Sequence, residues 1–372
     1  MLHDPYAPIQ NGAVGGEDNL AELQINTLRE LGHEVYDARF FDSGITRKKN
    51  QLLTQGLGKS KDVLKIITSF KPEVIHTLNL NQRSGYDWMY ATSIPIVSSI
   101  HNFRLFCPAS IAWRNGQVCT KCLDSSAINS IKYRCAGKIG TINSMRHLVF
   151  QRDYPQSSIP KLFLVTSKKM LDILRPIVTE SRMRVLRTPS MPSIKSSYSK
   201  NVRSGWLFAG RFTPEKGIIE LITNWPKNES LDIAGVGPLR NQILDLIKLK
   251  PNIKLIGTYP PGDHSIFMRY EGLVFPSSWI EGSPLVVMEC LGTGTPVICR
   301  EVSSASEQIR QTNGGAIIPG NLTEEKLNIA MHDIRENFNR YSQNSATKNL
   351  DEFSISAWKG KFQSFLYEAT QL

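Results

Sequence analysis

Residues 281–289 read Glu-Gly-Ser-Pro-Leu-Val-Val-Met-Glu, so two carboxylates, Glu281 and Glu289, bracket a Gly-Ser-Pro turn. One apolar run precedes the turn and another follows it. Ser283 is a favoured N-cap residue, and Pro284 suits the first position of a helix. The pattern therefore predicts a strand, a glycine turn and the start of a helix.

A helix start offers free N–H groups and a partial positive charge, and both favour the binding of phosphate. Glu281 is expected just before this helix and Glu289 in its second turn. One carboxylate would then meet hydroxyl groups near the phosphates, and the other would reach a second set of hydroxyls. This chemistry suits a nucleotide sugar. The alternative is an ordinary strand-to-helix turn with two solvated acids, because short motifs often match by chance.

The stretch resembles the signature of retaining glycosyltransferases of the GT-B fold, family 4, in which seven residues separate two glutamates. Further segments resemble motifs of this family, and they follow one another in the expected order. They are Gly15-Gly16, Leu31-Gly32-His33-Glu34-Val35, Gly210-Arg211-Phe212-Thr213-Pro214-Glu215-Lys216-Gly217, Ile233-Ala234-Gly235-Val236-Gly237-Pro238-Leu239 and Ile256-Gly257. The resemblance spans nearly the whole chain.

An α/β fold is expected, with two Rossmann-like, doubly wound parallel-sheet domains that face a central cleft (GT-B). A chain of 372 residues suits two domains. We expect an N-terminal, acceptor-side domain over 1–190 with a Cys-rich basic insertion at about 103–137, and a Ser-, Lys- and Pro-rich linker over 191–203. The nucleotide-sugar domain then covers 204–345, and a helix within 346–372 crosses back to the first domain or, alternatively, packs on the second alone.

Alternating strand and helix patterns support parallel sheets. Apolar residues at helical spacing predict a helix that includes residues 21–31 and stops at Gly32. Before it, only Met1 and Leu2 stand where the family has a longer apolar strand. The predicted strands are 74–76, 96–100, 162–165, 184–186, 206–210, 231–235, 253–257, 273–275 and 296–298.

Arg211 and Lys216 flank a turn that follows a glycine-ended strand. A guanidinium and an ammonium can neutralise a diphosphate leaving group, and the resemblance implies this role for both residues. It also implies that His101, at the end of a strand, contacts the transferred sugar. The expected catalytic residues are His101, Glu281, Arg211 and Lys216.

The expected donor site includes further residues. Gly15 and Gly16 would let the backbone approach the sugar or its phosphates, although a Gly-Gly pair is also typical of an ordinary turn. Donor choice is expected to depend on the loop Thr258–His264. The complete set of donor-binding residues is Gly15, Gly16, Arg211, Lys216, Glu281, Gly282, Ser283, Pro284, Leu285 and Glu289.

Cys107, Cys119, Cys122 and Cys135 fall within 29 positions, and the middle pair has the two-residue spacing of a metal knuckle. Four thiolates can close a tetrahedral zinc site, so a structural zinc is expected to staple this long loop. Disulfides, an iron–sulfur cluster and free thiols remain alternatives. No cofactor is expected for catalysis.

The basic residues are concentrated in one segment. From His101 to Ser190 there are 15 Lys and Arg against 4 Asp and Glu, and this excess of 11 equals the net charge of the whole chain. Such a surface favours anionic partners, so peripheral contact with an anionic membrane is a hypothesis, with a solvated surface as the alternative. No apolar run approaches the roughly 20 residues of a membrane span, and no signal peptide is visible. We expect a cytoplasmic protein.

The sequence thus predicts a retaining glycosyltransferase that moves a sugar from a nucleotide-sugar donor to a hydroxyl of a lipid-linked, polysaccharide or other glycan acceptor, as in cell-envelope or polysaccharide biosynthesis. One alternative is a zinc-stabilised basic protein that binds nucleic acid or another polyanion. No nucleic-acid-binding motif supports it, so a nucleic-acid partner is not expected. A sugar-nucleotide epimerase on the same fold is the other alternative.

Overall fold

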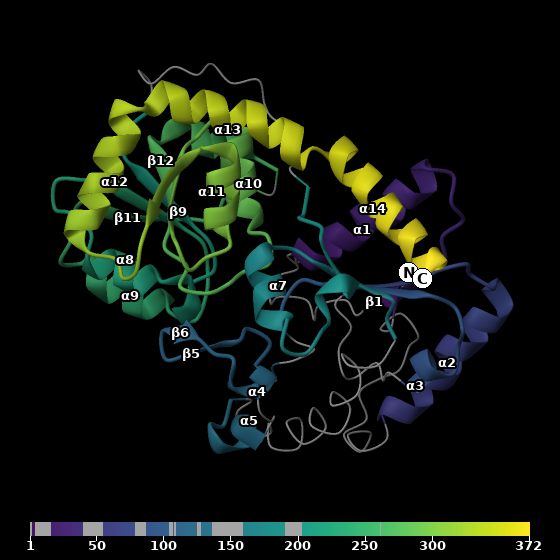
Figure 1. The fold of residues 1–372 in the computed structure, drawn as a ribbon. Helices are drawn as coiled ribbons and strands as arrows, with labels where there is room; N and C mark the ends of the chain where they lie inside the picture. Colours follow the sequence, from purple (N-terminus) through teal and green to yellow (C-terminus); the bar gives the residue numbers. More distant parts are fainter. Residues whose placement is uncertain are drawn as a thin grey trace. The chain divides into compact units, whose positions relative to one another are not determined.

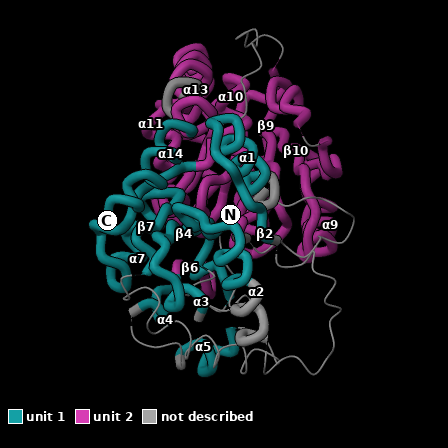
Figure 2. The backbone as a smooth tube through the Cα atoms, turned by 90° about the vertical axis from the view of Figure 1, so that its right-hand side faces the viewer, with its two compact units in different colours: residues 1–112, 119–187, 359–372 teal, residues 113–118, 188–358 magenta. Residues whose placement is uncertain are grey.

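Two six-stranded parallel sheets organise the chain. The computed structural model describes residues 2–3, 16–39, 55–78, 87–103, 107, 109–124, 128–135, 159–189, 203–260 and 262–372. Contacts divide the chain into two units (Figure 2): unit 1 comprises 1–112, 119–187 and 359–372, and unit 2 comprises 113–118 and 188–358.

The sheet of unit 1 has the strand order β2-β1-β3-β4-β7-β8. All its strand pairs are parallel, and β3, β4 and β7 are buried along their whole length. The strands are β1 (Leu2–His3), β2 (Ala38–Arg39), β3 (Ile75–Leu78), β4 (Ile96–Ile100), β7 (Leu162–Val165) and β8 (Met183–Val185). The helices are α1 (Gly16–Glu30), α2 (Gln55–Phe70), α3 (Asp87–Tyr90), α4 (Lys121–Asp124), α5 (Ile128–Lys132), α7 (Lys168–Leu174) and the 3-10 turn η3 (Glu180–Arg182).

The last helix, α14 (Ile355–Gln371), ends in unit 1. Phe362 is buried and meets the ring of His76 edge-on at 5.1 Å between centroids. Glu368 forms an ion pair with Arg184, and Lys359 forms one with Glu30 of α1. The end of the chain therefore belongs to the fold of its first part.

The sheet of unit 2 has the order β11-β10-β9-β12-β13-β14, which is the Rossmann order 3-2-1-4-5-6. Its strands are β9 (Trp206–Ala209), β10 (Leu231–Ala234), β11 (Ile253–Gly257), β12 (Gly272–Phe275), β13 (Val297–Arg300) and β14 (Gly315–Ile318). Its helices are η5 (Pro214–Lys216), α8 (Ile218–Thr223), α9 (Arg240–Ile247), η6 (His264–Arg269), α10 (Leu285–Gly292), α11 (Ala305–Thr312), α12 (Glu324–Glu336) and α13 (Phe338–Phe353).

Helices cover both faces of this sheet (Figure 1). One apolar cluster joins the sheet to α8, α9 and α12, and a second joins it to η6, α10 and α11. Because both faces are buried, the central strands are continuously apolar, as in other doubly wound sheets. The α10 helix contacts β12, β13 and α13, which explains why most of its residues are apolar.

The α/β class with parallel, Rossmann-like sheets is confirmed. The nine predicted strands occur, with ends displaced by at most two residues, while β2 and β14 were not predicted. The Cys-rich insertion is expected in the first domain, and the contacts of residues 113–118 within it group them with unit 2. Among the described helices, none is long and apolar enough to cross a membrane.

Candidate active site

The strand order of unit 2 reverses between β9 and β12, which pair in parallel. Open α/β sheets bind ligands at the carboxyl ends of the strands at such a switch point. The segment after β9 carries Arg211 and Lys216, and the segment after β12 carries Glu281. The fold of unit 2 therefore brings two motifs, about 65 residues apart in the chain, to one edge of the sheet.

The first segment ends in the short turn η5, and Gly217 follows it with a left-handed φ of 71°. A Cβ atom on Gly217 would lie 2.3 Å from the carbonyl oxygen of Pro276, which follows β12. Only glycine allows this approach. The glycine after Lys216 is thus explained by the close packing of the two segments that carry the charged side chains.

Lys216 and Glu281 form an ion pair, with 2.7 Å between Nζ and Oε2. Their side chains are 12% and 7% exposed. The ammonium also lies 5.6 Å from the ring centroid of Phe275 and 5.5 Å from that of Trp279. A cation and an anion are therefore held together in largely apolar surroundings, where charges interact more strongly than in water.

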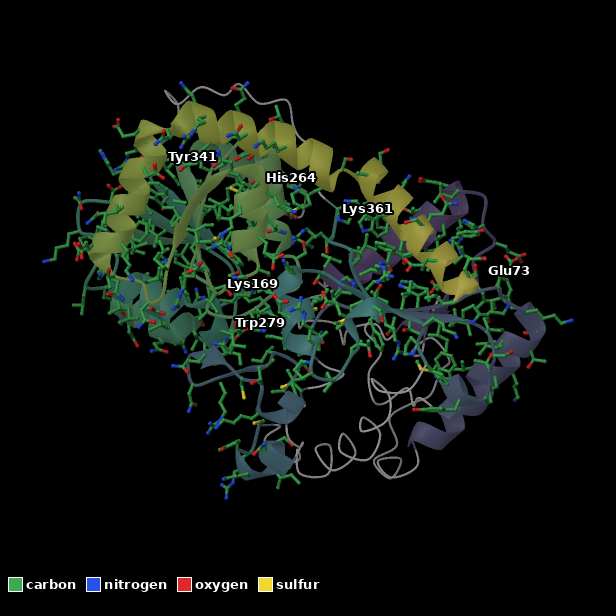
Figure 3. All side chains as sticks on the ribbon, in the orientation of Figure 1. Glu73, Lys169, His264, Trp279, Tyr341 and Lys361 are labelled. Atoms are coloured by element: carbon green, nitrogen blue, oxygen red, sulfur yellow. The ribbon has the colours of Figure 1, made fainter. Side chains whose placement is uncertain are left out.

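The second carboxylate oxygen of Glu281, Oε1, is buried and has no hydrogen-bond partner among the described residues. The indole nitrogen of Trp279, two positions earlier, is likewise buried without an acceptor. Figure 3 labels Trp279. Buried polar atoms in folded proteins are normally paired, so an unpaired acceptor and donor beside one ion pair indicate groups that a ligand or water would satisfy.

Helix α10 begins at Leu285, and Pro284 occupies the N-cap. The expectation that Ser283 caps the helix and that Pro284 is its first residue was wrong by one position. The Ser283 hydroxyl instead accepts a hydrogen bond from Gln308 Nε2 at 3.0 Å. The first bond within the helix runs from Val287 N to Pro284 O, so the preceding amides of α10 lie at the free, positive end of the helix.

Glu289 lies in the second turn of α10, as predicted, and its partners come from the loop 258–264. His264 Nε2 is 4.0 Å from Glu289 Oε1, and Tyr259 forms a hydrogen bond with the carboxylate. Figure 3 labels His264. Burial raises the pKa of Glu289, whereas His264 and Tyr259 act in the opposite direction. Tyr259 and His264 were not singled out individually, although their loop was expected to influence donor choice.

Arg211 is exposed, with 55% of its side chain accessible to solvent. Its guanidinium lies 4.0 Å from Oε1 of Glu215, which also accepts a 2.5 Å hydrogen bond from the Thr213 hydroxyl. Arg211 is therefore tethered weakly at one side of the η5 turn and can turn toward an anion.

His101 directly follows β4 in unit 1. Burial lowers its pKa to about 4, so the imidazole is neutral at neutral pH. Gly16 is the first residue of α1, and Gly15 lies outside the described residues. His101 thus directly follows a strand and Gly16 begins a helix, as the sequence predicts.

Among the described residues, the four clustered cysteines form no disulfide, and all four are partly buried. Burial raises the pKa of Cys122 to about 12, and the charges of Cys107, Cys135 and Cys119 act in the same direction. Within the described residues, however, no group of three or more His, Cys, Asp or Glu side chains has a geometry that could hold a metal ion.

Comparisons with known proteins show a family match and several similar folds. Residues 197–348 match the family model described as "Glycosyl transferases group 1". No curated protein matches the sequence. Among solved structures, sucrose-phosphate synthase from Thermosynechococcus elongatus is similar with a TM-score of 0.68 and 15% identity, covering 99% of this chain and 98% of that one.

Two further structures are similar over nearly their full length. HepE from Anabaena, solved in complex with UDP, gives a TM-score of 0.66 at 14% identity and 99% coverage of both chains. WaaG, a glycosyltransferase involved in lipopolysaccharide biosynthesis, gives 0.63 at 16% identity and covers 98% of this chain and 99% of that one. Identities this low show the fold, which is GT-B. The predicted resemblance to group 1 glycosyltransferases is confirmed over residues 197–348.

Proposed function

Because residues 197–348 match the group 1 glycosyl transferases, we propose that the protein is a retaining glycosyltransferase that uses a nucleotide-sugar donor. The observation that carries this proposal is the buried Lys216–Glu281 pair at the β9–β12 switch point, with Glu281 Oε1 left without a partner. HepE, which shares the fold, was solved with UDP-glucose, which supports a donor of this class.

In the proposed reaction the anomeric C–O bond to the diphosphate breaks, and a bond to the acceptor oxygen forms on the same face of the sugar. Negative charge grows on the leaving diphosphate, where Lys216, Arg211 and the start of α10 stabilise it. The acceptor proton passes to a phosphate oxygen of the leaving group. No side-chain base is then required.

Glu281 and Glu289 bind different parts of the donor. Glu281 accepts hydrogen bonds from sugar hydroxyls through its unpaired oxygen, and the resemblance assigns a contact with the sugar to His101, whose imidazole is neutral. Glu289, oriented by Tyr259 and His264, accepts hydrogen bonds from the ribose hydroxyls. Gly16 and Gly282–Leu285 contribute backbone groups.

A panel of nucleotide sugars tests the proposal. A donor should raise the melting temperature, because a ligand that binds only the folded state stabilises it by mass action. Slow hydrolysis of the same donor should disappear in Glu281→Ala. If no nucleotide sugar stabilises the protein or is hydrolysed, the proposal fails and binding of a polyanion becomes the better explanation.

We propose a lipid-linked or polysaccharide acceptor and contact of unit 1 with an anionic membrane. Lys121, Lys132 and Arg134 are exposed, and the first two lie 4.7 and 5.6 Å from the ring centroid of Tyr133. Such a cluster attracts acidic headgroups. Vesicles with and without phosphatidylserine test this, and a lack of salt-sensitive binding to the acidic vesicles would contradict it.

A structural zinc at Cys107, Cys119, Cys122 and Cys135 stays a proposal from the cysteine spacing, and binding would require these thiols to converge. Protein purified without chelator should contain one zinc per chain by elemental analysis. Cys119→Ser with Cys122→Ser should lose it, whereas Cys299→Ala, a change in the core of unit 2, should retain it. Absence of metal in the unsubstituted protein would refute the site.

A further inference from the structure

A two-stranded hairpin, β5 (Trp113–Arg114) and β6 (Gln117–Val118), lies between Cys107 and Cys119 in the sequence. Its turn residues, Asn115 and Gly116, have φ angles of 51° and 81°, as a two-residue turn of type I′ requires. The hairpin is stapled at its base by a 2.7 Å hydrogen bond from Cys119 N to Ala112 O. It is therefore a rigid, tightly closed element.

The hairpin belongs to unit 2, although the chain on either side of it belongs to unit 1 (Figure 2). Trp113 makes the specific contact: its indole N–H donates to the hydroxyl oxygen of Ser278 at 3.0 Å. Ser278 is buried and follows β12 by three residues. The hairpin thus reaches the segment that leads from β12 to Glu281.

Ser278, which accepts this hydrogen bond, is itself a donor. Its single O–H donates to the carbonyl oxygen of Glu215 at 3.2 Å, and its backbone N–H donates to the same oxygen at 3.0 Å. A hydroxyl can accept one hydrogen bond while it donates another, so the three groups form a consistent chain from indole to hydroxyl to carbonyl. Each bond in such a chain polarises and strengthens the next.

The middle and last groups of this chain, Ser278 and Glu215, belong to residues that adjoin the candidate site. Glu215 directly precedes Lys216, and Ser278 directly precedes Trp279, whose ring lies 5.5 Å from Lys216 Nζ. The hydrogen bonds between Ser278 and Glu215 hold the segment after β9 against the segment after β12. They therefore set the distance across which Lys216 and Glu281 meet.

We propose that Trp113 is a positioning residue for the Lys216–Glu281 pair, acting through Ser278 and Glu215. This inference rests on the proposed function for its effect on turnover. The hairpin of the Cys-rich insertion then supports the donor site and is not merely a surface loop. Its effect is on the geometry of the charge that stabilises the leaving diphosphate, so it changes kcat more than the KM for the donor.

The test uses Trp113→Phe, which keeps an aromatic ring and removes the N–H donor together with the five-membered ring of the indole. Together with Ser278→Ala and the double variant, it forms a double-mutant cycle on turnover of the donor found in the nucleotide-sugar panel. Each single variant should lower kcat about tenfold, as expected for one buried hydrogen bond, and the double variant should fall no further. Additive losses, or a kcat for Trp113→Phe equal to that of the unsubstituted protein, would overturn the proposal.

Trp225→Phe is the matched control. The Trp225 indole also donates a buried hydrogen bond in unit 2, to Glu229 O at 2.8 Å, but this bond adjoins neither Lys216 nor Glu281. The control should lower the melting temperature and leave kcat unchanged. An equal loss of kcat in both variants would mean that Trp113 acts only on stability, and the proposal would fail.

A second readout does not depend on activity. Lys216 is largely buried and ion-paired, so its reductive methylation, followed by peptide mass spectrometry, should be slow. Trp113→Phe should accelerate this labelling several-fold, and Trp225→Phe should not. An unchanged labelling rate refutes the positioning role, whereas faster labelling in a protein that turns over no nucleotide sugar would support that role and refute the proposed function.

Discussion

Two clusters of charge in unit 2, the first partly buried and the second largely buried, differ in one respect. In the first, Arg335 binds Glu229 at 2.6 and 2.7 Å and Glu271 at 2.5 and 3.1 Å. Trp206 Nε1 and Gly205 N donate to the same carboxylates. In the second, Lys216 binds one oxygen of Glu281, and the other oxygen has no partner among the described residues.

The comparison distinguishes charges that stabilise the fold from charges that are available to a ligand. A buried carboxylate whose oxygens all have donors is satisfied by the fold itself and joins the elements that carry it. A buried carboxylate with an unpaired oxygen costs stability, and such a cost is typical of functional sites. We therefore expect substitutions in the first cluster to affect stability and substitutions in the second to affect activity.

The largest effect is expected at the second cluster. Lys216→Ala and Glu281→Gln should each lower turnover of the donor by at least about 100-fold, since they remove groups that meet charge in the transition state. Each change also breaks a largely buried ion pair, so turnover is measured well below the melting temperature of each variant. Lys248→Ala, which removes an exposed lysine paired with Asp245 on α9, is the control and should be fully active. Near-normal turnover in both variants would contradict the assignment.

The opposite result is expected at the first cluster. Arg335→Met leaves two carboxylates without their cation and should destabilise the protein by roughly 3 kcal/mol in urea unfolding. Turnover below the melting temperature should remain. Arg310→Met breaks an ion pair with Glu301 in which both side chains are half exposed, so it should cost under about 0.5 kcal/mol. Equal costs for the two variants would break the distinction between the clusters.

Glu289 is intermediate, because protein groups satisfy it only in part. Glu289→Gln should raise the KM for the donor about tenfold and change kcat less, as expected when a hydrogen bond present in both ground and transition states is weakened. Glu325→Gln, at an exposed position of α12, is the control. A large loss of kcat with an unchanged KM would place Glu289 with Glu281 in the chemistry.

The smallest effect is a dependence of stability on pH. Burial opposes ionisation of Glu229, but hydrogen bonds from Arg335 and Trp206 outweigh it and hold the pKa below its ordinary value of 4.5. The folded state therefore binds this proton less readily than the unfolded state. The contribution of ionised Glu229 to the free energy of unfolding is complete above pH 4.5 and is lost as the pH falls through the folded-state pKa of this carboxyl. Urea unfolding of Arg335→Met should show a weaker loss over this range, and an identical loss would contradict the assignment.

Local sequence predicted most of the fold, since most strands of both sheets are short apolar runs. It missed β14, where Gly315–Ile318 is mostly half exposed at the sheet edge and lacks a continuous buried run. It also missed the β5–β6 hairpin, although Asn115-Gly116 is a strong turn signal. The spacing of the cysteines around the hairpin instead favours the interpretation of this segment as a metal-binding loop.

In the candidate site, the motifs predicted the meeting of Lys216 and Glu281, because both follow strands at the switch point. They did not predict the partners that orient these residues. Trp113 and Ser278 are 165 positions apart, and Tyr259 reaches Glu289 from a loop without regular structure. Such contacts depend on how loops pack, and no periodic pattern in the sequence encodes them.

The return of α14 to unit 1 has a consequence for how the protein is made. Residues 188–358 form nearly all of unit 2 as one continuous stretch, but unit 1 needs residues 359–372 as well. Most of the first unit is synthesised early. Its residues His76, Arg184 and Glu30 make their contacts with α14 only after Phe362, Glu368 and Lys359 have been synthesised. The unit that is translated first therefore cannot be completed until the residues of unit 2 have been synthesised.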